Sequence, residues 1–373
     1  MEDSLSDLMR NALDHYKKGE IDIAEDLFSK AIKINPDSYQ AIYNIGIIKL
    51  IKNNAFEAED YIKKAFLLNK SEKYFSSVID VYLTQNKTKD AENFLNKWNN
   101  LYSNELISMN HNKIIHQNEL HLMVKEYNLS KNNYTDKFEE KVKKFVKKYP
   151  KNSLSWKILG NILYQKRNDR DKNYIDTLIN TFETSYSQNK KDIDVILKLG
   201  SLYNEYNLFD KAISLYSISK KLLPNEHLLY FNCGNTFAKM GNVELAKNEF
   251  KISIEMNPNH FNSYKNIAKA YKDLNEIDKS EEMYKKMITI DKNDASGYRG
   301  LGAIKILKSQ LKDAKELLLK SITIDPNNTD AKQNLSICYF RLGETKKGID
   351  CAKDNVGVLS FSIDKKYGKF KII

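Results

Sequence analysis

The chain has 373 residues, of which 41% are hydrophobic and 29% are charged, with 13 glycines and 5 prolines. This composition favours helix nearly throughout, and the length exceeds what one compact core usually serves, so two domains or an open repeating array are expected. The formal net charge of +11 suits acidic or nucleic-acid partners, and no apolar run approaches the ~18 residues of a membrane-spanning helix.

Residues 1–20 are acidic and amphipathic, and they lack the basic and apolar regions of a signal peptide. The three cysteines, Cys233, Cys338 and Cys351, have neither metal nor disulfide spacing. An odd number of cysteines suits a reducing compartment, and a cytoplasmic location is therefore expected.

Residues 1–105 are predicted to form an N-terminal block of about three helix pairs. Two 34-residue units, 5–38 and 39–72, carry small and bulky side chains at matching places, and a weaker unit follows near 72–105. In this third unit Trp98 occupies a place where the first two have a small residue. The pattern is carried by Ala12, Ala24, Phe28, Ala31 and Pro36, by Gly46, Ala58 and Ala65, and by Ala91 and Leu95.

Residues 106–152 match the pattern least well and are predicted to be an irregular helical region, with the weakest joint of the array. The basic stretch 137–151 has three apolar residues spaced for one buried helix face, so its lysines are expected on a solvated surface. The histidines His111, His116 and His121 are five residues apart, which places them on different faces of a helix. A metal site is therefore not expected there.

Residues 153–355 are predicted to form a C-terminal block of about six repeats with a period of 34. Pro224 and Pro258 are 34 residues apart, and Pro326 follows 68 residues later. The first unit, 153–192, has about six extra residues, and later units start at 193, 227, 261, 295 and 329 without a gap. Small residues fill column 8 (Gly200, Gly234, Ala268, Gly302, Ser336) and column 20 (Ala212, Ala246, Ser280, Ala314, Gly348).

These columns resemble the tetratricopeptide repeat family, which has a large residue at column 4, Gly at 8, Tyr at 11, Ala at 20 and 27, an aromatic at 24 and Pro at 32. The best-matching unit carries Tyr230, Gly234, Phe237, Ala246, Phe250 and Pro258. The resemblance covers roughly 85% of the chain and implies an all-α helix-turn-helix solenoid, a right-handed superhelix in which helices A line the concave side and helices B the outside.

The residue type preferred at each column has a physical reason. Small residues at columns 8 and 20 let helices A and B approach closely, and Pro at column 32 ends helix B because it lacks an N–H. Column 15 falls at the turn between the two helices, where a left-handed residue is required. This conformation is predicted at Gly19, Asn53, Asn86, Asn207, Gly241, Asn275 and Gly343.

No catalytic motif is found, and a non-enzymatic protein without cofactor or metal is expected. The segment 343–350, GETKKGID, has the glycine spacing of a phosphate-binding loop, but Ile349 and Asp350 replace its Lys and Ser/Thr. It is interpreted as the turn and start of helix B in the last repeat.

The concave side is predicted to bind an extended peptide or partner protein as an interaction scaffold. Asn side chains both donate and accept, so they can pair with a peptide main chain, while Lys and Arg favour acidic groups. The predicted peptide-binding residues are Lys157, Asn161, Lys198, Asn232, Asn235, Lys265, Asn266, Lys269, Arg299 and Asn334.

Alternatives to this function stay open. Some family members clamp a C-terminal carboxylate, and Lys157 and Asn161 fit the first part of that pattern, but Lys198 replaces the next Asn. Nucleic-acid binding by the basic surface is a second function, whereas a membrane partner is not expected. A third is that the array is the targeting arm of a larger bacterial enzyme, of the sulfotransferase or 2-oxoglutarate oxygenase type, whose catalytic part is absent.

Residues 356–373 differ from the rest of the chain. Apolar residues on both sides of DKKYG predict a short strand-like tail that resembles a β-hairpin. A two-stranded hairpin is marginal alone, so this tail is expected either to cover the open end of the stack or to begin a further domain.

Overall fold

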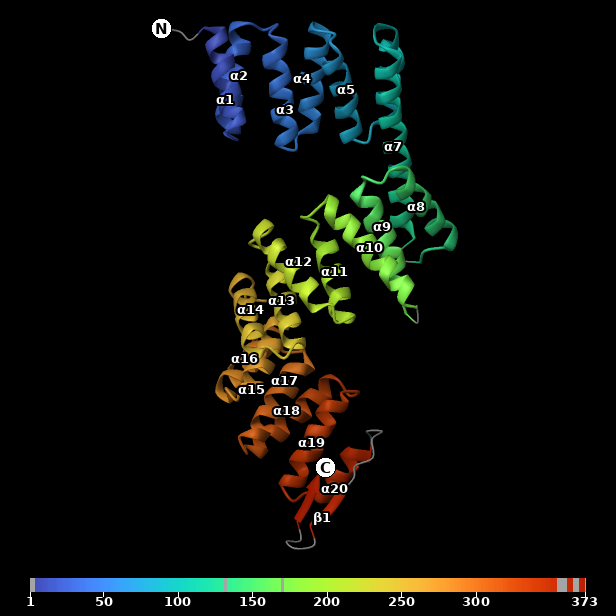
Figure 1. Ribbon diagram of the computed structural model, residues 1–373. Coiled ribbons are helices and arrows are strands. Elements are labelled where there is room, and N and C mark those ends of the chain that lie inside the picture. The colour runs from blue at the N-terminus through green and yellow to red at the C-terminus, as the bar shows by residue number, and fades with distance from the viewer. Residues whose placement is uncertain (1–3, 131–132, 169–170, 354–360, 365–368, 373) are drawn as a thin grey trace. The chain divides into compact units, whose positions relative to one another are not determined.

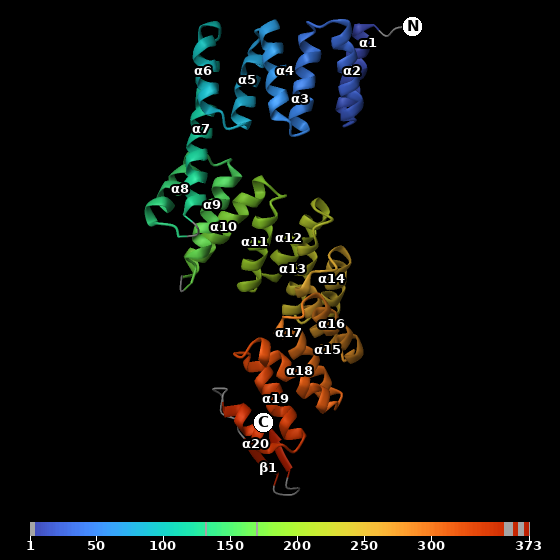
Figure 2. The same cartoon turned by 180° about the vertical axis from the view of Figure 1, so that it is seen from behind.

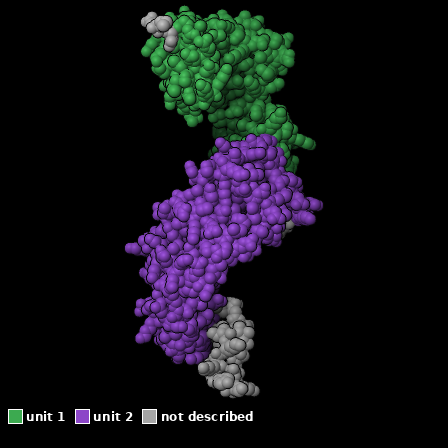
Figure 3. Space-filling view, turned by 60° about the vertical axis from the view of Figure 1, so that its left-hand side comes forward, with its two compact units in different colours: residues 1–166 green, residues 167–373 purple. Residues whose placement is uncertain are grey.

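The structure is a computed structural model that describes residues 4–130, 133–168, 171–353, 361–364 and 369–372. The chain divides into two compact units, residues 1–166 (unit 1) and 167–373 (unit 2), which Figure 3 shows in green and purple. Each unit is built from helices that run antiparallel to their neighbours in sequence (Figure 1; Figure 2). The described residues form 20 α-helices, which confirms the predicted all-helical repeat array.

Unit 1 contains nine of these α-helices and one short 3₁₀ turn. They are α1 (Leu5–Lys17), α2 (Ile21–Ile34), α3 (Tyr39–Ile51), α4 (Ala55–Leu68), α5 (Glu72–Thr84), α6 (Thr88–Trp98), η1 (Asn99–Leu101), α7 (Asn104–Leu129), α8 (Asp136–Lys148) and α9 (Ser153–Gln165) in the described part of the unit.

Unit 2 contains the other helices and two strands. They are α10 (Lys172–Gln188), α11 (Ile193–Glu205), α12 (Phe209–Leu222), α13 (His227–Lys239), α14 (Val243–Met256), α15 (Phe261–Asp273), α16 (Ile277–Ile290), α17 (Ala295–Leu307), α18 (Leu311–Ile324), α19 (Thr329–Arg341), α20 (Thr345–Lys353), β1 (Phe361–Asp364) and β2 (Lys369–Ile372).

The helix pairs of unit 2 repeat with constant lengths. In the four pairs from α11 to α18, helix A has 13 residues and helix B has 14. All seven predicted turn residues have a left-handed φ, between 56° and 81°. Ser309 has φ 60° in the same turn and was not predicted, because Ser rarely adopts this conformation.

Proline is confined to the joints between repeats, as predicted. Each of the five prolines, at 36, 150, 224, 258 and 326, lies two residues beyond the last residue of a helix B. A proline inside such a helix would cost about 3 kcal/mol, so a nearly all-helical chain can keep it only at these joints.

Close approach of the two helices in a pair explains the small columns. A Cβ added to Gly234 on α13 would lie 2.6 Å from Phe250 Cε1 on α14. Ala246, at the second small column, is fully buried beside Phe250 in the same core cluster. Aromatic side chains at column 24 therefore fill the space that the glycines leave open.

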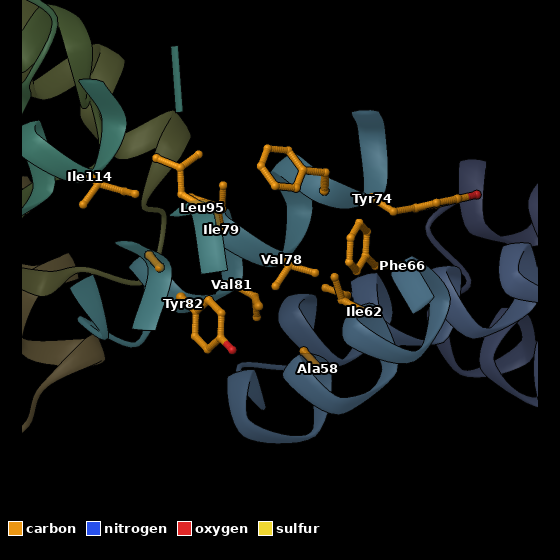
Figure 4. Close-up of a cluster of buried hydrophobic side chains, with 12 residues drawn as sticks. Ala58, Ile62, Phe66, Tyr74, Val78, Ile79, Val81, Tyr82, Leu95 and Ile114 are labelled. Carbon is orange, nitrogen blue, oxygen red and sulfur yellow. The ribbon is translucent and has the colours of Figure 1, made fainter. Parts of the chain in front are cut away.

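The core of unit 1 is also continuous between pairs. Figure 4 shows buried side chains of α4, α5, α6 and α7 in one cluster, including Phe66, Val78, Leu95 and Ile114. Each pair thus buries its apolar face against the next pair, as stacking in a repeat array requires.

The segment 106–152 owes its poor match to one long helix. Helix α7 has 26 residues, twice the 13 of the other helices A, and α8 follows it as helix B. Asn110 Nδ2 donates to Ser76 Oγ on α5 at 3.1 Å, whereas Lys148 of α8 pairs with Glu119 at 2.8 Å. The first half of α7 therefore packs on the preceding repeat, and its second half packs on α8. The predicted weakness of this joint stays a prediction.

The six extra residues of the repeat 153–192 are divided between a linker and a helix. The link from α9 to α10 spans residues 166–171, three more than the link 206–208 between α11 and α12. Helix α10 has 17 residues, three more than the helices B α12, α14, α16 and α18. Both insertions follow α9, the helix A of this repeat. The residues of α9 therefore keep the spacing of the repeat pattern.

The C-terminal tail is described only in part. Strands β1 and β2 pair antiparallel, with Phe361 opposite Ile372 and Asp364 opposite Lys369. The remaining residues of the predicted tail, 356–360, 365–368 and 373, lie outside the described residues. No helix in the described ranges is long and apolar enough to cross a membrane.

Candidate functional site

The predicted peptide-binding residues fall on helices A of both units. Lys157 and Asn161 lie on α9 in unit 1, and the other eight lie in unit 2. Those eight are Lys198 on α11, Asn232 and Asn235 on α13, Lys265, Asn266 and Lys269 on α15, Arg299 on α17, and Asn334 on α19.

Four of the predicted residues, Asn232, Asn235, Asn266 and Lys269, line one cavity of about 710 Å³ in unit 2. Helices α11, α13 and α15 supply most of its wall, and α14 contributes an apolar part that includes Phe250. Because these helices belong to consecutive repeats, the constant period brings side chains 31 to 34 positions apart onto one face. We call this site the amide cavity.

Some hydrogen-bonding groups of the asparagine side chains in the amide cavity are already used within the protein. Asn266 Nδ2 donates to Asn235 Oδ1 at 2.6 Å, which links α15 to α13. Asn232 Nδ2 donates to the Leu228 carbonyl at 2.8 Å within its own helix. No hydrogen bond among the described residues uses Asn235 Nδ2 or Asn266 Oδ1, so one donor and one acceptor remain for a ligand.

Asn204 on α11 also lines the cavity and was not among the predicted residues. Its side chain is only 7% exposed, and its Nδ2 donates to Thr236 Oγ1 on α13 at 2.9 Å. In the part of the chain that the structure describes, the buried Asn204 Oδ1 has no hydrogen-bond partner. An unpaired buried acceptor costs about 1–3 kcal/mol, so this oxygen favours a ligand that can donate to it.

Asn204 could have been found from the sequence. It occupies column 12 of its repeat, which the repeat pattern predicts to face the concave side together with columns 2, 5, 6, 9 and 13. What the sequence could not show is its burial, which depends on the neighbouring helix α13.

The carboxylates of the amide cavity have basic partners, whereas its lysines have no carboxylate partner in the described residues. Its two carboxylates, Glu205 and Asp273, each lie within 3.8 Å of a basic side chain outside the cavity lining. Lys239 Nζ donates to the Asn204 carbonyl at 3.2 Å, which leaves its charge uncompensated. Lys269 makes no ion pair within the described residues. The two ammonium groups therefore favour an acidic ligand.

The other predicted residues lie outside the lining of the amide cavity. Two cations have carboxylate partners on unit 2: Lys198 pairs with Asp194 at 3.1 Å, and Arg299 pairs with Asp330. On unit 1, Asn161 Nδ2 donates to the Tyr127 hydroxyl at 2.9 Å. Partnered groups are less available to a ligand than Lys269 is.

Other features of the sequence have structural explanations. The ring centroid of His116 lies 4.2 Å from that of Tyr149 with the two rings tilted, and burial lowers the pKa of this histidine. The described residues contain no group of three or more His, Cys, Asp or Glu placed to hold a metal ion. Gly343 has φ 79° at a turn between α19 and α20, as its interpretation as a repeat turn predicts. Burial raises the pKa of the Cys233 thiol to about 11, as expected for a buried cysteine.

Comparison with known proteins identifies the repeats at the cavity. The family model of the tetratricopeptide repeat matches residues 228–260 and 261–294, which contain the pairs α13–α14 and α15–α16. No curated protein matches the chain.

The solved structures that match the chain include MamA, YrrB and yeast Tom70. MamA shares 21% identity over 42% of this chain and 91% of its own, with a TM-score of 0.39. YrrB, described as "a TPR protein with an unusual peptide-binding site", shares 16% identity over 46% of this chain and 89% of its own, with a TM-score of 0.39. Yeast Tom70 shares 13% identity over 94% of this chain and 91% of its own, with a TM-score of 0.44.

Proposed function

Because the chain is a tetratricopeptide repeat protein, we propose that it is a non-catalytic scaffold that binds an extended segment of a partner protein in the amide cavity of unit 2. The single observation that carries this proposal is the buried Asn204 Oδ1, an acceptor without a partner in the described residues, at the wall of a cavity that opens among helices A.

Main-chain recognition follows from the atoms that remain in the cavity. Asn235 Nδ2 can donate to a peptide carbonyl, and Asn266 Oδ1 can accept from a peptide N–H group. Every peptide bond offers one donor and one acceptor, so these amides bind an extended chain without regard to its sequence.

Selectivity comes from charge. Lys239 and Lys269 are the two cations of the cavity, and neither makes an ion pair with the cavity's carboxylates. An acidic side chain of the bound segment supplies the missing counter-charge. Of the predicted residues, Asn232, Asn235, Asn266 and Lys269 therefore belong to the proposed site, together with Asn204.

A peptide-binding assay with the full chain tests this function. The probes are acetylated, amidated decapeptide pools with random flanks and a central residue fixed as Glu, Gln or Lys. We expect the Glu pool to bind best, and N235A/N266A to weaken binding to all pools by about five- to a hundredfold, the effect of two lost hydrogen bonds. The K269Q variant should lower only the preference for Glu over Gln.

The matched control is K286Q, a change of an exposed lysine on α16 that does not line the cavity. If N235A/N266A binds the pools as K286Q does, the amide cavity is not the site. If no pool binds but single-stranded DNA does, with affinity that falls steeply as salt is added, the basic surface binds nucleic acid instead.

The C-terminal tail and the location of the protein complete the proposal. Segment 356–373 contains the paired strands β1 and β2, and we assign to it the role of covering the open end of the stack after α20. Deleting 356–373 should lower the melting temperature and the solubility of the chain, and unchanged values would contradict this role. Buried, unpaired thiols at Cys233 and Cys338 support a cytoplasmic location.

A further inference from the structure

A second cavity, in unit 1, lies where the repeat pattern breaks. Trp98 occupies column 27 of the third repeat, and the equivalent residues of the first two repeats, Ala31 and Ala65, are fully buried. The larger Trp98 side chain is only half-buried, and its ring lies edge-on to Phe66, with centroids 5.2 Å apart. The bulky ring at this column therefore packs on the edge of the core cluster and stays partly exposed.

The cavity beside Trp98 has a volume of about 300 Å³ and is lined from α4, α5 and α6. Its wall is largely aromatic: Phe66, Tyr82, Phe94 and Trp98 all contribute. At its edge Leu67 is 62% exposed. Pockets that hold small ligands occupy roughly 300–1,000 Å³, so this one has room for a single apolar side chain.

Two lysines lie close to the half-buried ring of Trp98. Lys70 Nζ and Lys97 Nζ lie 4.9 and 5.5 Å from the centroid of Trp98. Neither lysine makes an ion pair in the described ranges of the chain. Of these two lysines only Lys97 lines the cavity, and the other lysine of the lining, Lys63, already pairs with Glu59.

The one carboxylate in the cavity lining is at the other end of α6. Asp90 lies in the first turn of the helix and Lys97 in the last, which separates them by roughly 10 Å along the helix axis at 1.5 Å per residue. The Trp98 end of the cavity is therefore locally cationic, and an apolar group bound there would exclude water from two ammonium groups. A carboxylate on the same ligand would compensate these charges.

We infer that unit 1 carries a second docking site, independent of the amide cavity, for a protein segment that places an aromatic or aliphatic side chain beside Trp98 and an acidic residue next to it. The apolar side chain fills the aromatic cavity, and the acidic neighbour pairs with Lys70 and Lys97. The proposed occupant differs from that of the amide cavity because it is selected by an apolar anchor and not by its main chain.

Fluorescence of Trp98 reports on this site directly. The chain has two tryptophans, so W156F leaves Trp98 as the only one in the full chain. The probe is an acetylated, amidated hexapeptide, Glu-Glu-Leu-Phe-Glu-Glu, and the matched peptide has Gln at every Glu. We expect a saturable change in Trp98 emission with the acidic peptide, and K97Q should weaken this binding by about two- to fivefold, the effect of one exposed ion pair.

Two controls keep the result specific. K64Q changes an exposed lysine of α4 that does not line the cavity and should leave the affinity unchanged. W98A, which restores the small residue of column 27, should remove the binding of a dye-labelled acidic peptide that remains in the N235A/N266A background, and a cooperative melting transition would show that unit 1 is still folded. The inference is overturned if neither peptide gives a saturable signal, if both peptides bind equally, or if W98A and K97Q bind as K64Q does. None of the changes W98A, K97Q and K64Q alters the amide cavity, so each site succeeds or fails separately.

Discussion

Units 1 and 2 use the same antiparallel helix pair but differ in how strictly they keep the 34-residue interval. In unit 2 the pairs from α11 to α18 keep constant helix lengths, and this regularity brings amide side chains of successive repeats onto one wall. In unit 1 the interval is lost at α7, and Trp98 replaces a small residue. In unit 2, equivalent positions of successive repeats thus line one cavity. In unit 1, the cavity is lined in part by Trp98, the residue that departs from the repeat pattern.

The largest effects should come from the two cores. Phe75 in unit 1 and Phe250 in unit 2 are each at most 1% exposed, so replacing either by Ala should lower the free energy of unfolding of its own unit by about 3–5 kcal/mol. Hydrogen exchange followed by mass spectrometry should show faster exchange in the unit that carries the substitution. Phe56, which is 73% exposed, is the control, and F56A should change little. Equal loss of protection in both units after F75A would contradict separate units.

A smaller effect is expected from an ion-pair cluster of unit 2. Hydrogen bonds from Lys285 and Lys308 lower the pKa of Glu281 from its usual 4.5 to about 2. The ionised carboxylate therefore stabilises the fold above pH 4.5, and this contribution is lost as the pH falls from 4.5 towards 2. We expect E281Q to lower the free energy of unfolding at pH 7 by about 1–3 kcal/mol and to flatten its fall below pH 4.5.

Chemical denaturation between pH 2.5 and 7 measures this effect. The control is E282Q, which changes the adjacent, exposed glutamate. If the free energy of unfolding falls equally steeply with pH in E281Q and in the unchanged protein, the ionised Glu281 carboxylate does not stabilise the fold.

The smallest effect on stability is expected at Asn204. Replacing it by Leu removes the hydrogen bond to Thr236, but it also removes the buried oxygen without a partner in the described residues. These terms oppose each other, so the free energy of unfolding should change by less than about 1 kcal/mol. Binding of the Glu-centred pool should nevertheless fall. A large loss of stability with unchanged binding would assign Asn204 a structural role.

Much of the fold can be predicted from local chemistry. Proline and left-handed turn residues mark the joints, and the column 8 glycine at 234 fits the ring of Phe250, because each of these features depends on one helix pair. The length of α7 could not be predicted, since its second half lacks a distinctive pattern and is held by partners on α8.

The candidate site was predictable only in part. Asn232, Asn235, Asn266 and Lys269 follow from their columns, and the structure places all four at one cavity. The ion pairs of Lys198 and Arg299 depend on side-chain geometry within and between repeats, which columns do not specify. The burial of Asn204 depends in the same way on the neighbouring helix.

Photo-crosslinking tests most directly whether helices A of unit 2 receive an extended chain. A benzoylphenylalanine placed at Ala238, an exposed residue of the cavity lining, would contact a bound segment, whereas one at Lys286 on α16 would not. With the Glu-centred decapeptide pool, we predict cross-linked peptide at position 238 and none at 286 by mass spectrometry. Cross-links at 286 alone, or equally at both positions, would contradict binding in the amide cavity.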